Sequence, residues 1–319
     1  MKAILAAVFG ILACGLAAAQ PAASASPPLV IVVGGPPGTP GDVVARAISG
    51  PMAVELGQPV VVENRPGAAG TVALAQVARA RPDGNVLGVL ALQSAVAPAL
   101  LKSMPYDAAR DLLPARQLSW VNNLLVVRAD APFSSLEDVL KAGRSQALTY
   151  ASGGNGTPAH LAGELFAHEA RVQLKHVPFN GAVAGVTAVL GGHVQMMFAT
   201  TPAVAQLVQS GKLRALAATS PERLPLAPAV ATLAEGGVPA ATVQDWHGLV
   251  APAGTPPQRI AQIAAAAGTA LASDAVRQRL AAAGIDPATG SGPVEFGAWV
   301  KRETERWQAV VQRAGISLQ

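Results

Sequence analysis

The sequence predicts an α/β fold of two domains with a ligand cleft between them. The chain has 319 residues, which is room for two domains of ordinary size. Apolar residues make up 51% and charged residues 13%, a composition typical of a packed globular protein. Strand-like apolar runs alternate with helical patterns in two separate stretches, as parallel sheets covered by helices require. We expect residues 29–125 and 249–319 to form a discontinuous first domain and residues 126–248 to form the second.

Residues 1–25 have the order of a secretory signal peptide, with Lys2 near the start, an apolar run, and then small residues and prolines. The run spans about 17 residues and no basic stop-transfer residues follow it, which favours cleavage over a membrane-spanning helix. We therefore expect cleavage after Ala19 or Ala25 and a periplasmic protein. Cys14, the single cysteine, leaves open a lipoprotein in which it is the lipid-modified first residue.

The first α/β unit follows this leader. The apolar run 29–33 predicts a strand that is buried on both faces. From Asp42 onward apolar residues recur at helical spacing, and Asp42 is expected to cap that helix. The glycine-rich turn GGPPGTPGD joins the two elements. Further strands are expected at 59–64 and 86–92, with a helix at 71–79 between them.

The same order recurs in the middle of the chain, with a strand at 147–151, the turn SGGNGT at 152–157 and a helix at 158–170. Strand-like segments at 123–128 and 248–251 flank this unit, and we expect them to be the two crossings of a hinged cleft. The remaining expected elements are strands at 175–178, 194–199 and 213–219 with a helix between the first two, and helices at 257–272, 274–283 and 294–314.

Both glycine-rich turns are candidate anion sites, because each precedes a helix whose first backbone amides have no partner within the helix. Ser152, Asn155 and Thr157 add side-chain donors in the second turn. Neither turn has the spacing of a phosphate loop or of a dinucleotide-binding turn. Each turn alone is equally compatible with a purely structural role. The pair at equivalent positions indicates a small ligand with one or two carboxylates, bound between the domains.

Several longer motifs resemble those of a known family, among them PPGTPGDVVAR, GQPVVVENRPGAAGTVA, YASGGNGTPAHLAGELF, VPFNGAVAGVTAVLGGHVQMMF and WHGLVAPAGTP. The resemblance is to the periplasmic solute receptors of tripartite tricarboxylate transporters, the Bordetella uptake gene family. It covers essentially the whole chain after the leader. It implies a two-domain periplasmic-binding-protein fold, type II, of the Venus-flytrap kind, with a small carboxylate held between the domains by the two turns.

The resemblance also implies an extracytoplasmic solute-binding protein that delivers its ligand to the membrane components of such a transporter. The alternative is a periplasmic sensor or scaffold that signals to a membrane partner without transport. We expect a monomer that uses no cofactor. We do not expect an enzyme, because the sequence has no nucleophile elbow, zinc-protease motif or nucleotide loop.

The chain departs from the family's pattern at positions that bear on the ligand. The first turn lacks the family's aromatic residue and carries Thr39, and the third loop has Gln93, Ser94 and Ala97 where relatives often have Ser or Thr and Asn. Ala199 stands where many relatives have an aspartate suited to an amino group, which favours simple carboxylates over amino acids. The predicted ligand-binding residues are Pro37, Gly38, Thr39, Ser94, Ser152, Gly153, Asn155, Gly156, Thr157, His160, Phe179 and Ala199.

Other classes of partner are disfavoured. The net charge of 23 − 19 = +4 is spread along the chain and only 4% of residues are aromatic, which argues against nucleic acid. His160, Glu164 and His168 have the spacing of one helix face, but surface pairs commonly share that spacing, and no metal site is expected. Trp246 is expected to pack near a crossing, and Arg65 to form a salt bridge within the scaffold.

Overall fold

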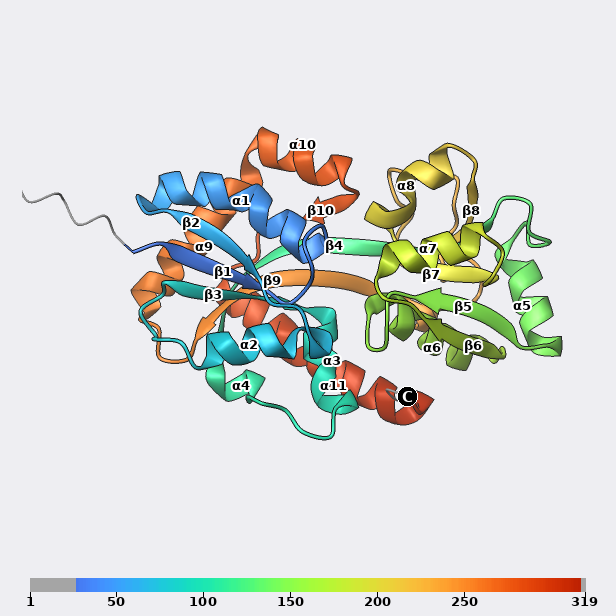
Figure 1. Ribbon diagram of the computed structural model, residues 1–319, viewed down its shortest axis with the longest axis horizontal. Helices are drawn as coiled ribbons and strands as arrows, with labels where there is room; N and C mark the ends of the chain where they lie inside the picture. Colours follow the sequence, from blue (N-terminus) through green and yellow to red (C-terminus); the bar gives the residue numbers. More distant parts are fainter. Residues whose placement is uncertain (1–26, 317–319) are drawn as a thin grey trace, which may run out of the picture.

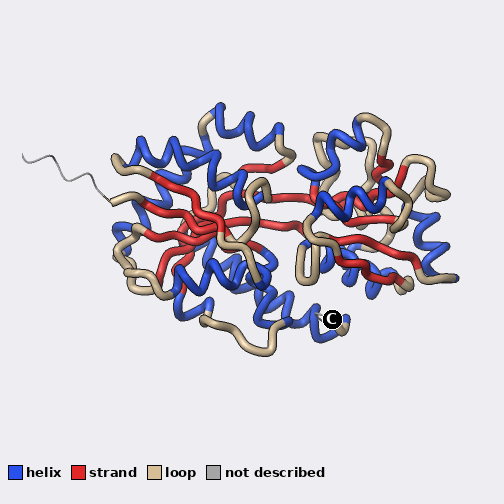
Figure 2. Tube along the Cα trace, in the orientation of Figure 1, coloured by secondary structure: helices blue, strands red, loops and turns tan. Residues whose placement is uncertain are grey.

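The structure is a computed structural model and describes residues 27–316. Two lobes lie side by side, joined by two long strands, β4 (Leu112–Arg128) and β9 (Gln244–Pro252) (Figure 1). In each lobe the strands lie inside and helices cover them (Figure 2). The predicted leader, with Cys14, lies outside the described residues. Within 27–316, no helix has the length and apolar character needed to span a bilayer.

The first lobe is built on three parallel strands. β1 (Leu29–Val33) lies between β2 (Val60–Asn64) and β3 (Val86–Ala91) and pairs in parallel with both. β9 continues this sheet antiparallel to β3. Ile31 packs in one core cluster and Val32 in another, on the opposite face of the sheet. Because both faces are covered, β1 is apolar throughout, which is why its bounds are predicted correctly.

Helices cover the two faces of this sheet. Side chains of α1, α9 and α10 form one core cluster with it, and those of α2, α3 and α11 form another. The elements are α1 (Pro40–Leu56), η1 (Ala68–Gly70), α2 (Thr71–Ala78), α3 (Leu92–Leu100), α4 (Ala108–Asp111), α9 (Pro257–Ala272), α10 (Asp274–Ala282), β10 (Ile285–Pro287) and α11 (Pro293–Ala314). The predicted helices at 71–79, 257–272, 274–283 and 294–314 are confirmed within one residue at each end.

α1 begins two residues earlier than predicted, and Asp42 is not its cap. Thr39 occupies the N-cap position, and the helix starts at Pro40, whose fixed φ suits the first helical position. Asp42 is therefore the third residue of the helix. α6 begins in the same way, with Thr157 before Pro158. Both glycine-rich turns therefore end in a Thr-Pro pair, in which Thr is the N-cap and Pro is the first residue of the helix.

β4 belongs to both lobes. Its residues 112–122 pair with β9, whereas 123–128 pair with strands of the second lobe. Both crossing strands are longer than predicted. The register of β4 against β9 shifts between Pro114 and Arg116 and again between Gln117 and Ser119, and such irregularities interrupt the alternation by which a strand is recognised. The predicted domain boundaries fall inside these two continuous strands, so the division into domains stays a prediction.

The second lobe repeats the arrangement of the first. β5 pairs in parallel with both β6 and β7, as β1 does with β2 and β3, and β7 and β8 pair with β4. The elements are α5 (Leu136–Ser145), β5 (Leu148–Ser152), α6 (Pro158–Ala170), β6 (Leu174–Pro178), α7 (Ala182–Leu190), β7 (Met196–Thr200), α8 (Thr201–Gln209), β8 (Leu213–Ala218) and η2 (Pro239–Ala241). α6 has its predicted bounds, whereas α3, α5 and α8 have no counterpart among the predicted helices.

Two predictions about single side chains are confirmed. Trp246 is fully buried in the core of the first lobe, and its ring meets that of Phe296 edge to face with the centroids 5.8 Å apart. Arg65 forms an ion pair with Glu63 at the end of β2. Both residues therefore serve the scaffold.

Candidate functional site

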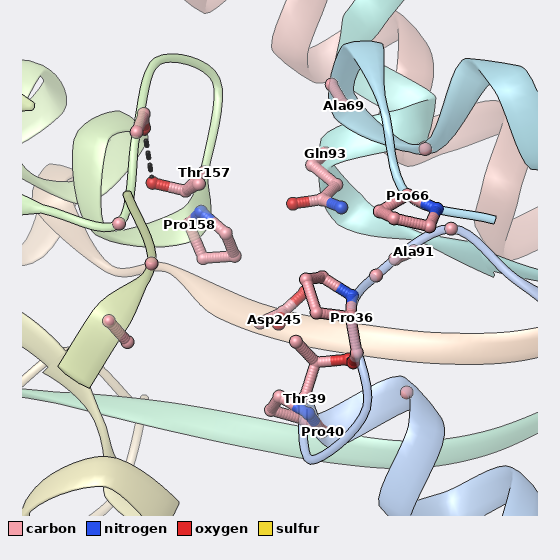
Figure 3. Close-up of a pocket in the computed structure, with 18 of the residues that line it drawn as sticks. Pro36, Thr39, Pro40, Pro66, Ala69, Ala91, Gln93, Thr157, Pro158 and Asp245 are labelled. Carbon is pink, nitrogen blue, oxygen red and sulfur yellow. Dashed lines mark hydrogen bonds between the residues drawn. The ribbon is translucent and has the colours of Figure 1, made fainter. Parts of the chain in front are cut away.

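A pocket of about 360 Å³ lies between the two lobes (Figure 3). The first lobe lines it with the turn after β1, with η1 and with the start of α3. The second lobe lines it with the turn after β5, the loop after β6 and the end of β7, and β9 contributes Asp245 and His247. A pocket of this volume suits a small organic molecule.

Six helices begin at this pocket. In none of them does the side chain of the N-cap residue accept a hydrogen bond from the first turn. The N-cap residues that line the pocket are Thr39 of α1, Gly70 of α2, Ala91 of α3, Thr157 of α6, Gly181 of α7 and Thr200 of α8. First-turn amides are thus directed at the pocket from both lobes, and the helix dipoles add partial positive charge. This arrangement suits an anion.

Of residues 27–316, the ionisable side chains in the lining are Asp245 and His247, and no lysine or arginine of this range belongs to it. Burial raises the pKa of the Asp245 carboxyl to about 7 and lowers the pKa of His247 to about 4. The imidazole Nε2 of His247 lies 3.9 Å from Oδ2 of Asp245, and its Nδ1 lies 3.3 Å from Oγ of Ser119. His247 is therefore uncharged at neutral pH, and the pocket has no cationic side chain of its own.

Asp42 and Asn64 hold the first glycine-rich turn in place. The carboxylate of Asp42 accepts hydrogen bonds from the backbone amide of Gly38 and from the side-chain amide of Asn64, each at 2.9 Å, and pairs with Arg46. Asn64 also donates to the carbonyl of Gly35, at 3.0 Å. The amide of Gly38 is therefore engaged within the turn. The buried carboxylate of Asp42 therefore holds the first glycine-rich turn in its conformation.

A buried polar cluster holds the second turn. Nδ1 of His160 accepts a hydrogen bond from the Gly156 amide at 3.1 Å, and its ring stacks on that of His176 with the centroids 4.3 Å apart. Nε2 of His176 lies 2.6 Å from Oγ of Ser152, which accepts a hydrogen bond from the Gly154 amide at 3.0 Å. Burial lowers the pKa of both histidines to about 4. Both rings are therefore neutral at neutral pH.

Four of the predicted site residues belong to the lining: Thr39, Gly153, Asn155 and Thr157. The others lie outside it, and several have structural partners. The hydroxyl of Ser94 donates to the carbonyl of Ala69 at 3.1 Å, and Ala199 is fully buried in the core of the second lobe. The residues outside the lining are Pro37, Gly38, Ser94, Ser152, Gly156, His160, Phe179 and Ala199. Ligand contact by these twelve residues stays a prediction.

His160, Glu164 and His168 do not converge on one point. Nε2 of His160 lies 4.0 Å from Oε1 of Glu164, which accepts a hydrogen bond from the hydroxyl of Tyr150 at 2.5 Å. His168 instead contacts Glu169, with Nδ1 and Oε1 3.3 Å apart. Over the described range 27–316, no group of three or more His, Cys, Asp or Glu side chains is placed to hold a metal ion.

Some polar residues of the lining are absent from the predicted set, namely Gln93, Asn180, Asp245 and His247. Gln93 lies in the first turn of α3, which has no capping residue to mark its start in the sequence. Asp245 and His247 carry a detectable signal. β9 is otherwise mostly apolar, and an acid and an imidazole within a buried strand indicate a polar cavity beside it.

Comparison with known proteins agrees with this architecture. Residues 44–316 match the sequence model of the tripartite tricarboxylate transporter family receptor, TctC. Protein BugT of Bordetella pertussis is 34% identical over 298 residues, covering 91% of this chain and 90% of BugT. MatC of Rhodopseudomonas palustris with bound malate superposes with a TM-score of 0.81 at 34% identity, covering 89% of this chain and 99% of MatC.

A second solved structure, Rpa4515 of R. palustris with adipate, has a TM-score of 0.82 at 30% identity and covers 91% of this chain and 99% of its own. These neighbours have the two-domain fold of periplasmic binding proteins, which confirms the predicted fold and resemblance. The matched family consists of receptors that bind solutes and not of enzymes. The chain therefore belongs to the tripartite tricarboxylate transporter receptor family.

Proposed function

We propose that the protein captures a small carboxylate in the pocket between its lobes and delivers it, in the periplasm, to the membrane components of a tripartite tricarboxylate transporter. The observation that carries this proposal is the convergence of six helix N-termini on one pocket without a lysine or arginine in its lining. Such a site stabilises a negative charge through backbone donors and helix dipoles.

The size and donors of the pocket favour a ligand with one or two carboxylates. A volume of about 360 Å³ accommodates a molecule of a few carbon atoms with its first hydration waters. Hydrogen bonds to a charged acceptor contribute about 1.5–3 kcal/mol each when water is excluded. A few such bonds from each lobe are sufficient for tight binding, and they favour closure of the lobes around the anion.

Side chains of both lobes supplement the backbone donors. Figure 3 shows Gln93 of the first lobe pointing across the pocket toward Thr157 and Pro158 of the second. Thr39 and Thr157 each donate their hydroxyl proton to a carbonyl of their own turn, at 2.8 and 2.7 Å, and keep their oxygens as acceptors. We assign ligand contact to Gln93 and Asn155, and to Thr39 and Thr157 with their hydroxyl protons turned from these carbonyls to the ligand. Among the other predicted residues, Gly38 is bonded within the first turn, and Ser152, Gly156 and His160 hold the second.

Export is part of the proposal. The pattern of residues 1–25 supports a cleaved leader, and the solved relatives include proteins described as periplasmic. Mass spectrometry of the protein from the cell envelope tests this step. A mature chain that starts after Ala19 or Ala25 is expected. A chain that retains Met1 contradicts export by cleavage. A chain that starts at a lipid-modified Cys14 supports the lipoprotein alternative instead.

Isothermal titration tests the binding step. The purified protein is titrated with malate, adipate, citrate, succinate, aspartate and ATP after treatment with a chelator. Saturable binding of at least one carboxylate is expected without added metal. Heat with ATP alone, or with none of these compounds, contradicts the proposal. Delivery is tested separately by uptake of the bound carboxylate into proteoliposomes carrying the transporter's membrane components, with and without the receptor.

A further inference from the structure

Among the described residues, Asp245 is the one acidic side chain in the lining of a pocket that is otherwise built for an anion. It lies on β9, between the turns of the two lobes, close to Pro36 and Thr39 in Figure 3. Its side chain is nearly fully buried, with 4% of the residue exposed. A carboxylate ligand in this pocket must therefore bind beside another carboxyl group.

We infer that Asp245 binds the ligand as a neutral carboxylic acid, donating a hydrogen bond to an oxygen of the bound carboxylate, so that the pocket takes up a proton together with the anion. This inference rests on the proposed function. It makes Asp245 a specificity-determining residue. A fully anionic carboxylate is accepted when Asp245 is protonated and is repelled when it is not.

The partners of Asp245 are backbone amides and not cations. Its Oδ1 accepts a hydrogen bond from the amide of Trp246 at 2.9 Å, and the amide of Leu92, in the first turn of α3, also bonds to the carboxyl. The nearest basic side chain is His247, whose Nε2 lies 3.9 Å from Oδ2, beyond hydrogen-bond distance. The carboxyl of Asp245 therefore has no cationic partner and can carry a proton that it presents to a ligand.

Within the described residues, no lysine or arginine of the elements packed around Asp245 forms an ion pair with its carboxyl. His247 beside it on β9 is neutral, because burial holds its pKa near 4. β3, η1, α2 and α3 carry no titratable side chain. Opposite Asp245 on β4 stands Val121, and the basic residues of that strand are remote, Arg116 facing α9 and Arg128 at the far end beside Asp130. On α1, α6 and α11, Asp42 pairs with Arg46, His160 lies 4.0 Å from Glu164, and Glu303 pairs with Arg306. The other ionisable side chains of these three helices all lie outside the pocket lining: Glu55, His168, Glu169, Glu295, Lys301, Arg302, Glu305 and Arg313.

The dimensions of the pocket make the proton necessary. A cavity of about 360 Å³ is about 9 Å across if treated as a sphere, so the two carboxyl groups cannot lie far apart. Two carboxylates sharing a poorly hydrated site repel each other, and one of them holds a proton more tightly as a result. Burial already raises the pKa of Asp245 to about 7 in the empty pocket, and a bound anion raises it further.

The sign of the pH dependence follows. Below about pH 7 Asp245 is already protonated, so binding of the anion takes up little proton and affinity is nearly constant. Above about pH 7 binding takes up to one proton, and affinity falls by up to tenfold for each pH unit. A ligand with an ammonium group would behave in the opposite way, since it would favour the ionised Asp245 and release a proton.

The test is calorimetric titration with malate and adipate between about pH 5.5 and pH 8.5, in buffers of different protonation enthalpy. Wild-type protein is expected to lose at least about tenfold in affinity across the upper half of this range and to take up protons there. Asp245→Asn keeps the size and a hydrogen-bond donor but has no charge, so it is expected to bind as wild type does near pH 6 and to show a flat profile. Asp245→Ala, which has neither the charge nor the donor, is expected to show the same flat profile and to bind more weakly than Asp245→Asn at every pH.

Asp286→Asn is the matched control. Asp286 lies on β10 outside the pocket lining and is an exposed residue whose carboxyl pKa is also raised by desolvation. It therefore tests whether the loss of another carboxyl group with a raised pKa changes binding. This variant is expected to keep the wild-type profile. Circular dichroism melting verifies that each variant is folded. The inference is overturned if wild-type binding is independent of pH and buffer, if Asp245→Asn keeps the wild-type slope, or if binding releases protons. If neither dicarboxylate nor any other carboxylate of the panel binds at any pH, the proposed function fails as well.

Discussion

Nδ1 of His160 accepts a hydrogen bond from the backbone amide of Gly156, and the two nitrogens are 3.1 Å apart. The contact ties the first turn of α6 to the glycine-rich turn that precedes it, and it requires a neutral imidazole. The ring of His176 stacks on that of His160 and contacts Ser152. His160, His176 and Ser152 therefore hold the turn without belonging to the pocket lining. The pocket's second-lobe wall therefore depends on residues that do not face it.

His160→Phe tests this support. The phenyl ring preserves the stacking surface for His176 but leaves the Gly156 amide without its acceptor in a buried position. We expect a loss of about 1–3 kcal/mol in the free energy of unfolding, measured by urea denaturation, and weaker binding of the carboxylate. His168→Phe on the same helix is the control, since His168 is partly exposed and contacts only Glu169. Equal stability of the two variants would contradict the assigned role.

Acid is expected to destabilise the fold through the same ring. The pKa of His160 is about 4 in the fold, because burial lowers it from its ordinary value of 6.5. Between these two values the unfolded chain binds more protons, so the free energy of unfolding falls as the pH falls from about 6.5 to about 4, by up to about 3 kcal/mol for this residue. Asp245 opposes this trend over the whole of this range, since its pKa is raised from 3.8 to about 7 and its folded form binds more protons between these values.

Urea denaturation of wild type and His160→Phe at several pH values isolates the contribution of His160. The difference in unfolding free energy between the two proteins is expected to shrink as the pH falls through this window. A difference that is constant with pH would show that the imidazole is not held neutral by the fold.

Gly34→Ala tests the close approach of two turns in the first lobe. A Cβ atom at residue 34 would lie 2.6 Å from Cα of Gly70, so the turn after β1 and the start of α2 would have to separate. We expect a loss of about 1–3 kcal/mol in stability and at least tenfold weaker binding, because both segments line the pocket. Gly50→Ala is the control. It lies exposed within α1, outside the pocket lining, with open space around its Cβ position apart from its chain neighbours, and Gly50→Ala is expected to bind the carboxylate as wild type does.

Gln93→Leu tests the side-chain amide that Gln93 contributes to the pocket lining (Figure 3). The substitution keeps most of the volume and removes the amide, so we expect about tenfold weaker binding of a carboxylate with unchanged stability. Gln76→Leu, at an exposed position of α2, is the matched control and is expected to bind as wild type does. Calorimetric titration of both variants with the same ligand makes the comparison. Unaltered affinity in Gln93→Leu would remove this residue from the site.

The fold could be predicted where the sequence carries a local signal. A continuous apolar run marks β1, and a proline at the first helical position marks α6 and α9. β4 is largely missed, because its register shifts break the alternation and its polar residues face partners distant in the sequence. Asp42 resembles a helix cap locally, but its actual partners, Gly38 and Asn64, are set by the tertiary fold.

The site was predictable in part for the same reason. Glycine-rich turns before helices indicate anion binding, and Thr39 and Thr157 do line the pocket. Gln93 lines the pocket from the first turn of α3, a helix with no capping residue to mark its start in the sequence. Asp245 lines it from β9, a strand whose other residues are mostly apolar. Which residues face the pocket and which support it from behind depends on packing between segments far apart in the chain, and no local pattern encodes that.

A crystal structure of the protein with its tightest-binding carboxylate tests the central claim most directly. The account predicts that a carboxylate group of the ligand lies between Thr39 and Thr157, within hydrogen-bond distance of first-turn amides of α1 or α6. It predicts no contact between the ligand and a lysine or arginine side chain. It also predicts an oxygen of the ligand within about 2.5–3.0 Å of a carboxyl oxygen of Asp245, a distance that requires a shared proton. A ligand bound outside this pocket, or one whose carboxylate pairs with a cationic side chain, would contradict the account.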